Sequence, residues 1–295
     1  ELCRKMIRDF SGESGRLAMI TQHSYPFGCS YENPGGYPDL VPRDAGEARE
    51  KMLSPDVWDI YEGIHEELSE GLEGSEIPLR LTETNSYWFS GLDGASNTHA
   101  SALWGIDYLF WWISHSAHGL NFHTGDKTGG EITMPCQYAA FVTSPNGYEV
   151  RPLGYAMKLF DLSGQGRLLP VNVSSSPDRG LAAYATLAED NCVLVTLINR
   201  VYGNGSTNTG VQIRMDTLPC SSTAQIIFLT APGGDIAAKS GLLLGGAPIQ
   251  EDGSWSGQWS SLESVDCDNS ILIFNVSIPP ASAAVVKIMT QFWLK

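Results

Sequence analysis

Pro78-Leu79-Arg80-Leu81-Thr82-Glu83-Thr84-Asn85-Ser86 is the stretch that decides the fold. A short apolar strand runs up to Glu83, which stands among hydroxyl and amide side chains. Such a strand carries its carboxylate to its C-terminal end, and in parallel α/β barrels this is the end where reactions take place. A carboxylate held there can act as a nucleophile or as an acid/base. The alternative is a solvated acid that merely ends a strand.

Strand and helix patterns alternate up to about residue 162. A Gly/Pro-rich loop runs from Phe27 to about Arg43, and Ser54-Pro55-Asp56 has the sequence of a helix start. The other expected elements are a strand over Arg16–Thr21, a strand over Leu79–Thr82, a helix from about Asn97 to His118 capped by Gly119, a strand over Leu120–His123 and a helix over Gly154–Phe160. Three strand–helix units of this kind predict the last part of a (β/α)8 barrel.

The pattern changes after Gly164, where short β-branched or alternating runs are separated by turn sequences such as Asn204-Gly205. The runs are Leu181–Leu187, Cys192–Ile198, Gly210–Met215, Ala224–Leu229, Ile271–Ser277 and Ala283–Met289. Regular short strands with turns between them predict an antiparallel sandwich. The expected fold class is therefore α/β plus all-β, with a partial (β/α)8 catalytic barrel over residues 1–163 and a C-terminal β-sandwich over residues 164–295.

The composition limits the partners that the chain can have. A net charge of −15 argues against nucleic acid, which needs a basic footprint. The longest apolar run, near Trp104 to Ile113, contains Asp107 and is too short to cross a bilayer, so no membrane partner is expected. The six cysteines are widely spaced, with no Cys/His cluster at metal-ligand spacing. We therefore expect neither a metal nor another cofactor, while disulfides remain open.

Six segments carry a resemblance to a known family: Thr82–Tyr87, Ser96–Trp104, Gly119–His123, Arg151–Tyr155, Leu168–Val171 and Ile278–Ser282. They resemble the glycoside hydrolases of family 79 in clan A, which are the β-glucuronidases and heparanase-like enzymes. The first segment is fairly specific, and the last, which lies in the expected sandwich, is weak by itself. The resemblance implies a retaining glycoside hydrolase that acts on a glucuronic-acid-containing oligosaccharide or glycoside.

In that family the Glu of the Glu-Thr-Asn-Ser sequence at the seventh strand is the nucleophile, so the resemblance gives this role to Glu83. A nucleophile must stay ionised to attack the anomeric carbon, and nearby hydroxyl and amide donors such as Asn85 favour the charged form. Tyr25 ends the preceding strand, where its hydroxyl would hold the nucleophile or a sugar hydroxyl. Asn85 and Tyr25 are therefore expected to bind substrate.

Two further residues are expected on the same rim. His123 ends the next strand, and Tyr138 falls where family members have a tyrosine-containing loop that reads the uronate carboxylate. The loop Thr124–Gly147 departs from the family's sequence, so the resemblance fixes uronate specificity less firmly than the nucleophile. For Tyr25 and His123 the alternative is a structural role. His23 is expected to be a packed residue at a strand end, and His115 and His118 to lie near a helix C-terminus, where they would favour its dipole.

The family's acid/base Glu belongs to an Asn-Glu pair at the end of the fourth strand, and no such pair occurs in this sequence. Glu1 and Glu13 do not fit its place. The first residues, Glu1–Phe10, include no initiator Met and read as the tail of an amphipathic helix. We therefore expect an N-terminally truncated piece of a longer protein, inactive by this mechanism on its own because a retaining enzyme needs two carboxyl groups.

Three sequons, at Asn172, Asn204 and Asn275, favour a secreted glycoprotein. Two other functions stay open beside the β-glucuronidase. One is a retaining hydrolase of a neutral β-glycoside on the same architecture. The other is a non-catalytic carbohydrate-binding protein that has kept part of a barrel.

Overall fold

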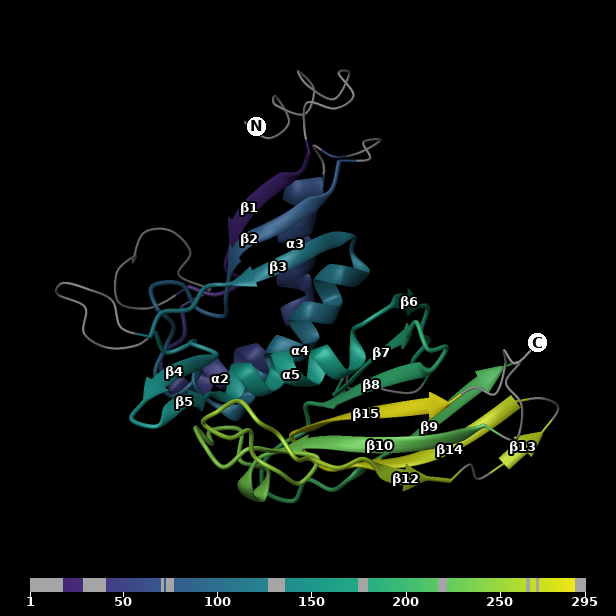
Figure 1. Ribbon diagram of the computed structural model, residues 1–295. Helices are drawn as coiled ribbons and strands as arrows, with labels where there is room; N and C mark the ends of the chain where they lie inside the picture. The colour runs from purple at the N-terminus through teal and green to yellow at the C-terminus, as the bar shows by residue number, and fades with distance from the viewer. Residues whose placement is uncertain are drawn as a thin grey trace. The chain divides into compact units, whose positions relative to one another are not determined.

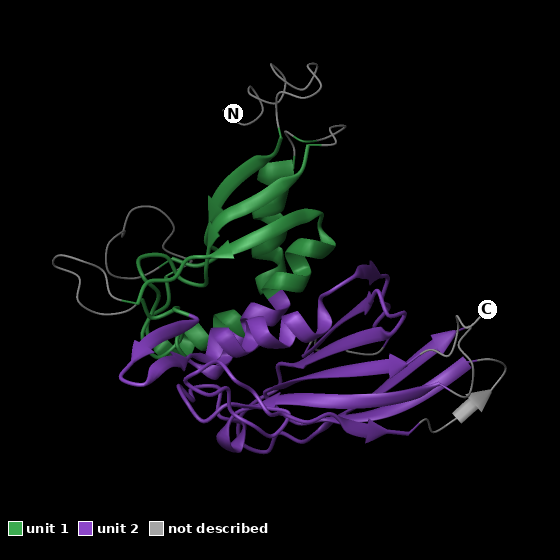
Figure 2. Ribbon diagram, viewed as in Figure 1, with its two compact units in different colours: residues 1–97, 108–139 green, residues 98–107, 140–295 purple. Residues whose placement is uncertain are grey.

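The computed structural model describes residues 18–28, 41–69, 72, 77–126, 136–174, 180–216, 222–263, 266–268 and 271–289 of the 295-residue chain. The chain divides into two compact units, and the division falls within one helix (Figure 2). Unit 1 comprises residues 1–97 and 108–139, and unit 2 comprises residues 98–107 and 140–295. The boundary between residues 163 and 164 that the sequence suggested stays a prediction.

Unit 1 is built on a three-stranded parallel sheet. Its elements are β1 (Ile20–Ser24), α2 (Ala45–Leu53), α3 (Val57–Ser69), β2 (Leu79–Thr84), the second half of α4 (His99–Ser114) and β3 (Ala117–Phe122). The strands lie in the order β1-β2-β3 (Figure 1). Tyr108 of α4 packs on this sheet, since its hydroxyl lies 2.7 Å from that of Thr84 and its ring contacts Phe122. Tyr61 of α3 meets Tyr108 edge to face, with ring centroids 5.0 Å apart.

Three features of unit 1 differ from the expectation. The first strand begins at Ile20 and runs on to Ser24, while the expected start at Arg16 lies outside the described residues. Helix α2 was not expected; it begins after Asp44, whose side chain accepts a 2.9 Å hydrogen bond from the backbone N–H of Glu47.

The expectation that Gly119 caps the long helix is wrong, because Gly119 lies inside β3. Helix α4 ends earlier, at Ser114, and the chain reverses through Ser116, which takes a left-handed φ of 67°. The ring of His115 bonds the carbonyl oxygen of Trp111 at 2.7 Å, so this histidine satisfies a helix C-terminal group as expected.

Unit 2 contains the first half of α4, a hairpin, one further helix and two antiparallel sheets. Its elements are β4 (Phe141–Ser144), β5 (Gly147–Val150), α5 (Pro152–Ser163), β6 (Arg167–Leu169), β7 (Leu181–Leu187), β8 (Val193–Asn199), β9 (Thr209–Asp216), β10 (Thr223–Thr230), the 3-10 turn Pro232–Gly234, β11 (Leu243–Leu244), β12 (Ser260–Leu262), β13 (Asp266–Asp268), β14 (Ile271–Ile278) and β15 (Ser282–Met289). The larger sheet has the order β11-β10-β15-β8-β7-β6 with β12 beside β10, and the smaller has the order β13-β14-β9.

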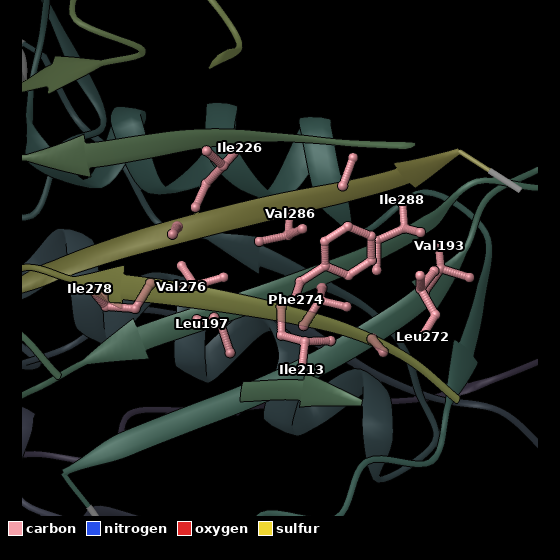
Figure 3. Close-up of a cluster of buried hydrophobic side chains, with 14 residues drawn as sticks. Val193, Leu197, Ile213, Ile226, Leu272, Phe274, Val276, Ile278, Val286 and Ile288 are labelled. Atoms are coloured by element: carbon pink, nitrogen blue, oxygen red, sulfur yellow. The ribbon is translucent and has the colours of Figure 1, made fainter. Parts of the chain in front are cut away.

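The two antiparallel sheets share one apolar core (Figure 3). Phe274 of β14 is fully buried there, together with Val286 of β15 and Leu197 of β8. Alternate residues of each strand supply this core, as the period of two in their sequences requires. Packed antiparallel sheets in unit 2 and a helix-covered parallel sheet in unit 1 agree with the expected α/β plus all-β class.

The first half of α4 is held within unit 2 by polar contacts. The backbone N–H groups of His99 and Ala100 donate to the carbonyl oxygens of Ala238 and Ile236 at 2.8 and 2.9 Å, which satisfies helix N-terminal donors. Further along, Asp107 forms an ion pair with Arg200. None of the helices in the described residues is long and apolar enough to span a membrane.

Candidate active site

The C-terminal ends of the three parallel strands of unit 1 bring the candidate residues together. In the strand register His23 of β1 stands beside Glu83 of β2, and Thr84 of β2 stands beside Phe122 of β3. Because parallel strands end at the same edge of their sheet, the residues that follow them share that edge. Glu83, the penultimate residue of β2, therefore has residues of both neighbouring strands at its sides.

Tyr25 and His23 both face the carboxylate of Glu83. The Tyr25 hydroxyl donates a 2.8 Å hydrogen bond to Oε1 of Glu83, and Nδ1 of His23 lies 3.5 Å from Oε2. The Glu83 side chain is 35% exposed, so it is reachable from solvent, while that of His23 is 62% exposed. The phenol of Tyr25 thus fixes one oxygen of the Glu83 carboxylate. The other oxygen lies beside the solvent-exposed imidazole of His23.

His123 and Tyr138 form a second pair at the same edge. Nδ1 of His123 and the hydroxyl of Tyr138 are 2.6 Å apart, and the two rings meet edge to face. Asn85 lies beneath them, since its side-chain N–H donates to the carbonyl oxygen of His123 at 2.9 Å and to that of Tyr138 at 3.4 Å. The rings of Tyr25 and Tyr138 lie 6.3 Å apart between centroids, which joins the two pairs.

The turn after β2 fixes the segment that carries Tyr138. The backbone N–H of Gln137 donates to the carbonyl oxygen of Ser90 at 2.6 Å, and the Gln137 side chain accepts from Asn97 at 2.9 Å. Gly91 has a left-handed φ of 82°, and a Cβ there would lie 2.8 Å from Cδ1 of Tyr138. Only glycine fits this close approach without moving the ring.

Burial moves the pKa of both phenols further from neutral pH. Burial, followed by the hydrogen bond to Glu83, raises the pKa of Tyr25 well above its usual range. Burial also raises the pKa of Tyr138 to about 12. Tyr25 therefore acts as a neutral hydrogen-bond donor to Glu83, and neither phenol is a competing anion beside it.

The structure brings together all five residues that the sequence singled out: Tyr25, Glu83, Asn85, His123 and Tyr138. Their chemical roles stay predictions. His23 was expected to be a packed residue, yet it lies beside Glu83; the register of two parallel strands is the signal that would have found it. His115 and His118 take no part in this cluster's hydrogen bonds.

Glu1 and Glu13 lie outside the described residues, as does part of the expected loop Thr124–Gly147. The end of that segment is not a loop but forms β4 and the start of the β4–β5 hairpin. In the described part of the chain, no three His, Cys, Asp or Glu side chains gather closely enough to hold a metal ion. Cys136 and Cys192 are buried free thiols, and the side chains of the other four cysteines are outside the described set.

No protein-family model matches the chain. In sequence, it is 28% identical over 143 residues to a β-glucuronidase of Aspergillus niger, an alignment that covers 48% of this chain and 26% of that protein.

Solved structures share its fold. A 4-O-α-L-rhamnosyl-β-D-glucuronidase from Fusarium oxysporum has a TM-score of 0.66 at 18% identity over 91% of this chain. An α-L-arabinofuranosidase from Thermotoga maritima has a TM-score of 0.62 at 14% identity over 97% of this chain. The matches cover 52% and 55% of those two structures, so the chain spans about half their length. The sequence and structural likenesses together confirm the resemblance to a glucuronidase-like glycoside hydrolase.

Proposed function

We propose that the chain is part of a retaining glycoside hydrolase acting on β-glucuronides, with Glu83 as its nucleophile. The observation that carries this proposal is the hydrogen bond from Tyr25 to Glu83 at the C-terminal edge of a parallel sheet. Such an edge is where barrel enzymes hold their reactive groups. The three strands and their helices would be the last part of a (β/α)8 barrel, and residues 164–295 a C-terminal sandwich.

Glu83 would attack the anomeric carbon with the oxygen that Tyr25 leaves free. The attack forms a glycosyl-enzyme and expels the aglycone, and water then releases the sugar with retention. A second carboxyl group about 5–5.5 Å away must protonate the leaving group and then activate the water. We assign that group to a part of the whole protein that this chain does not include, so the chain alone would be inactive.

The choice of a glucuronide rests on the similarity to the A. niger β-glucuronidase and on the residues around Glu83. The alternative of a neutral β-glycoside has support too, because a bifunctional glucanase-xylanase shares the fold. The non-catalytic alternative accounts less well for a carboxylate that is half-buried, hydrogen-bonded by a phenol and still open to solvent.

We also propose that the protein is a secreted glycoprotein. Asn172 and Asn204 are exposed outside the regular strands. Asn275 is exposed on β14, but its amide oxygen accepts a 3.4 Å hydrogen bond from Gln212. The first two sites therefore suit glycosylation better than the third.

The test uses the complete protein and an aryl β-glucuronide. Glu83→Gln should fold normally and lose at least about 1,000-fold in kcat, as expected for a missing nucleophile. The matched control is Glu149→Gln, an exposed carboxylate on β5, which should stay within threefold of wild type. A Glu83→Gln variant that keeps a tenth of the wild-type rate would overturn the assignment.

A covalent trap tests the same step directly. A 2-fluoro-glucuronide with a good leaving group should accumulate as a glycosyl-enzyme, because the fluorine destabilises the oxocarbenium-like transition state of release. Peptide mass spectrometry should place the adduct on Glu83. An adduct on another residue, or hydrolysis only of the corresponding glucoside, would favour a different nucleophile or the neutral-sugar alternative.

A further inference from the structure

The contact between His123 and Tyr138 determines which ring nitrogen of the imidazole is available to a ligand. At 2.6 Å between Nδ1 and Oη, it is shorter than the 2.8 Å bond between Tyr25 and Glu83. One side of the ring is therefore committed to Tyr138.

The last residue of β2 and the side chain of Asn85, which follows it, hold the main chain of His123 in place. Its N–H donates to the carbonyl oxygen of Thr84 at 2.8 Å, and its own carbonyl oxygen accepts from Asn85 at 2.9 Å. Because main-chain bonds fix the residue and Tyr138 fixes the ring, the orientation of the imidazole is set before any ligand arrives.

The position of the imidazole proton follows from the donors that surround it. Tyr138 has one proton to give, and its raised pKa of about 12 keeps that proton on the phenol at neutral pH. The proton of Tyr25 is already used on Glu83. An imidazole nitrogen is a better acceptor than a phenol oxygen, which favours donation from Tyr138 to Nδ1 of His123. With Nδ1 as the acceptor, the imidazole carries its own proton on Nε2.

Nε2 has no hydrogen-bond partner among the described residues, and the His123 side chain is half-buried at the rim of the strands. A donor in that position is ready for an acceptor that comes from outside. His123 also lies at the same C-terminal edge of the parallel sheet as Glu83, whose carboxylate the sugar must approach.

We propose that His123, through its Nε2–H, is the side chain that binds the carboxylate of a uronate, and that Tyr138 is a positioning residue that holds the imidazole in this tautomer. The inference rests on the proposed function, since it names the group that would read the substrate of that site. It assigns the contact with the uronate carboxylate to His123, where the sequence had suggested Tyr138.

The tautomer is what gives discrimination. An ionised carboxylate only accepts hydrogen bonds, so an Nε2–H binds it and a bare Nε2 lone pair repels it. The hydroxymethyl group of a neutral sugar both donates and accepts, so it is indifferent to the tautomer. The net charge of −15 gives an anionic sugar no long-range attraction to this chain, so a local contact has to recognise the carboxylate.

The kinetic test compares variants of the complete protein on an aryl β-glucuronide and on the matching glucoside. His123→Leu should lower kcat/KM for the glucuronide by about 10- to 100-fold, as for one hydrogen bond to a charged group, and leave the glucoside within about threefold. His123→Gln keeps an N–H donor and should recover part of the loss. Tyr138→Phe should show the same selective loss, while the control Tyr155→Phe removes a phenol in unit 2 and should affect neither sugar.

A spectroscopic test needs no turnover. In ¹⁵N-labelled protein, long-range ¹H–¹⁵N correlations should show His123 as the Nε2–H tautomer, and Tyr138→Phe should mix the tautomers. Glucuronic acid should shift the Nε2 signal, and glucose should not. An Nδ1–H tautomer in the wild type, an Nε2 signal that glucuronic acid leaves unmoved, or equal kinetic losses on both sugars would each overturn the inference. Because the titration does not depend on the nucleophile, a failed Glu83 assignment would leave these readouts intact.

Discussion

Tyr25 and Glu83 lie 58 positions apart in the sequence, yet the phenol of the first donates a 2.8 Å hydrogen bond to Oε1 of the second. The bond fixes one carboxylate oxygen and leaves Oε2 toward His23 and solvent. A nucleophile needs this asymmetry, because one oxygen must be free to attack while the group keeps its orientation.

Replacing Tyr25 with Phe should therefore slow the reaction without destroying the fold. A hydrogen bond to a charged group contributes about 1.5–3 kcal/mol, which corresponds to a loss of roughly 10- to 150-fold in kcat/KM on an aryl β-glucuronide. Steady-state kinetics on the complete protein would measure this loss. Tyr148→Phe is the matched control, because Tyr148 is 53% exposed on β5. Activity of Tyr25→Phe within threefold of wild type would show that the bond does not hold the nucleophile.

The ion pair between Asp107 and Arg200 should be the most sensitive polar contact of unit 2. Nη2 of Arg200 lies 2.6 Å from Oδ1 of Asp107, their side chains are 3% and 2% exposed, and Tyr184 also donates to that oxygen at 2.8 Å. Asp107→Asn removes the countercharge of a buried guanidinium, so it should lower the free energy of unfolding by about 3–5 kcal/mol.

A matched pair on the surface provides the control for that prediction. Lys158 and Asp161 are 2.8 Å apart, but their side chains are 35% and 57% exposed. Asp161→Asn should change the free energy of unfolding by no more than about 1 kcal/mol. Urea denaturation of both variants would give the comparison. Similar small losses in the two variants would mean that the buried pair contributes no more than a surface pair.

The six longer strands of the two antiparallel sheets could be predicted almost to the residue, because β-branched or alternating runs mark them in the sequence. The run Leu181–Leu187 is β7 itself, and Ile271–Ser277 differs from β14 by one residue. Glu83 could be placed at a strand end for the same reason. In contrast, the hairpin β4–β5 was hidden in an expected loop, since its four-residue strands are too short to show a period.

The partners of Glu83 could be predicted only in part. The sequence and the family resemblance indicated a rim that includes Tyr25, His123 and Tyr138. They could not give the pairing of His123 with Tyr138, because it depends on Gly91 and Asn97 holding the segment of Tyr138 against the turn after β2. Nor could they give the strand register that sets His23 beside Glu83.

Acid should destabilise the protein through His99. This residue is buried at the start of α4, its Nε2 bonds the carbonyl oxygen of Ala281 at 2.8 Å, and burial lowers its pKa from 6.5 to about 4. Above pH 6.5, the pKa of this histidine in the unfolded chain, the ring is neutral in both the folded and the unfolded state. The stability that depends on the neutral ring is then fully present. As the pH falls from 6.5 to about 4, only the unfolded chain takes up the proton, and about 3 kcal/mol of stability is lost.

The variant His99→Gln isolates this contribution from that of the carboxylates. Glutamine keeps an N–H donor for Ala281 and does not titrate. The free energy of unfolding of the variant, measured by urea denaturation, should fall less steeply than that of wild type between pH 6.5 and 4. Parallel curves over that range would show that His99 is protonated equally in both states.

Two glycines that lie in helices should respond in opposite directions to the same substitution. A Cβ on Gly154 of α5 would lie 2.5 Å from the carbonyl oxygen of Ala140 and 2.7 Å from Cγ1 of Val150. That carbonyl cannot easily move, because it accepts a 2.9 Å hydrogen bond from the backbone N–H of Arg151. Gly154→Ala should cost about 1–3 kcal/mol for the overpacking, offset by up to about 1 kcal/mol of helix propensity.

Gly63 of α3 has no neighbour within 4 Å of such a Cβ, so Gly63→Ala should stabilise the protein by up to about 1 kcal/mol. Thermal unfolding followed by circular dichroism should show a lower Tm for the first variant and a higher one for the second. A rise in Tm for Gly154→Ala would mean that α5 can shift away from Ala140.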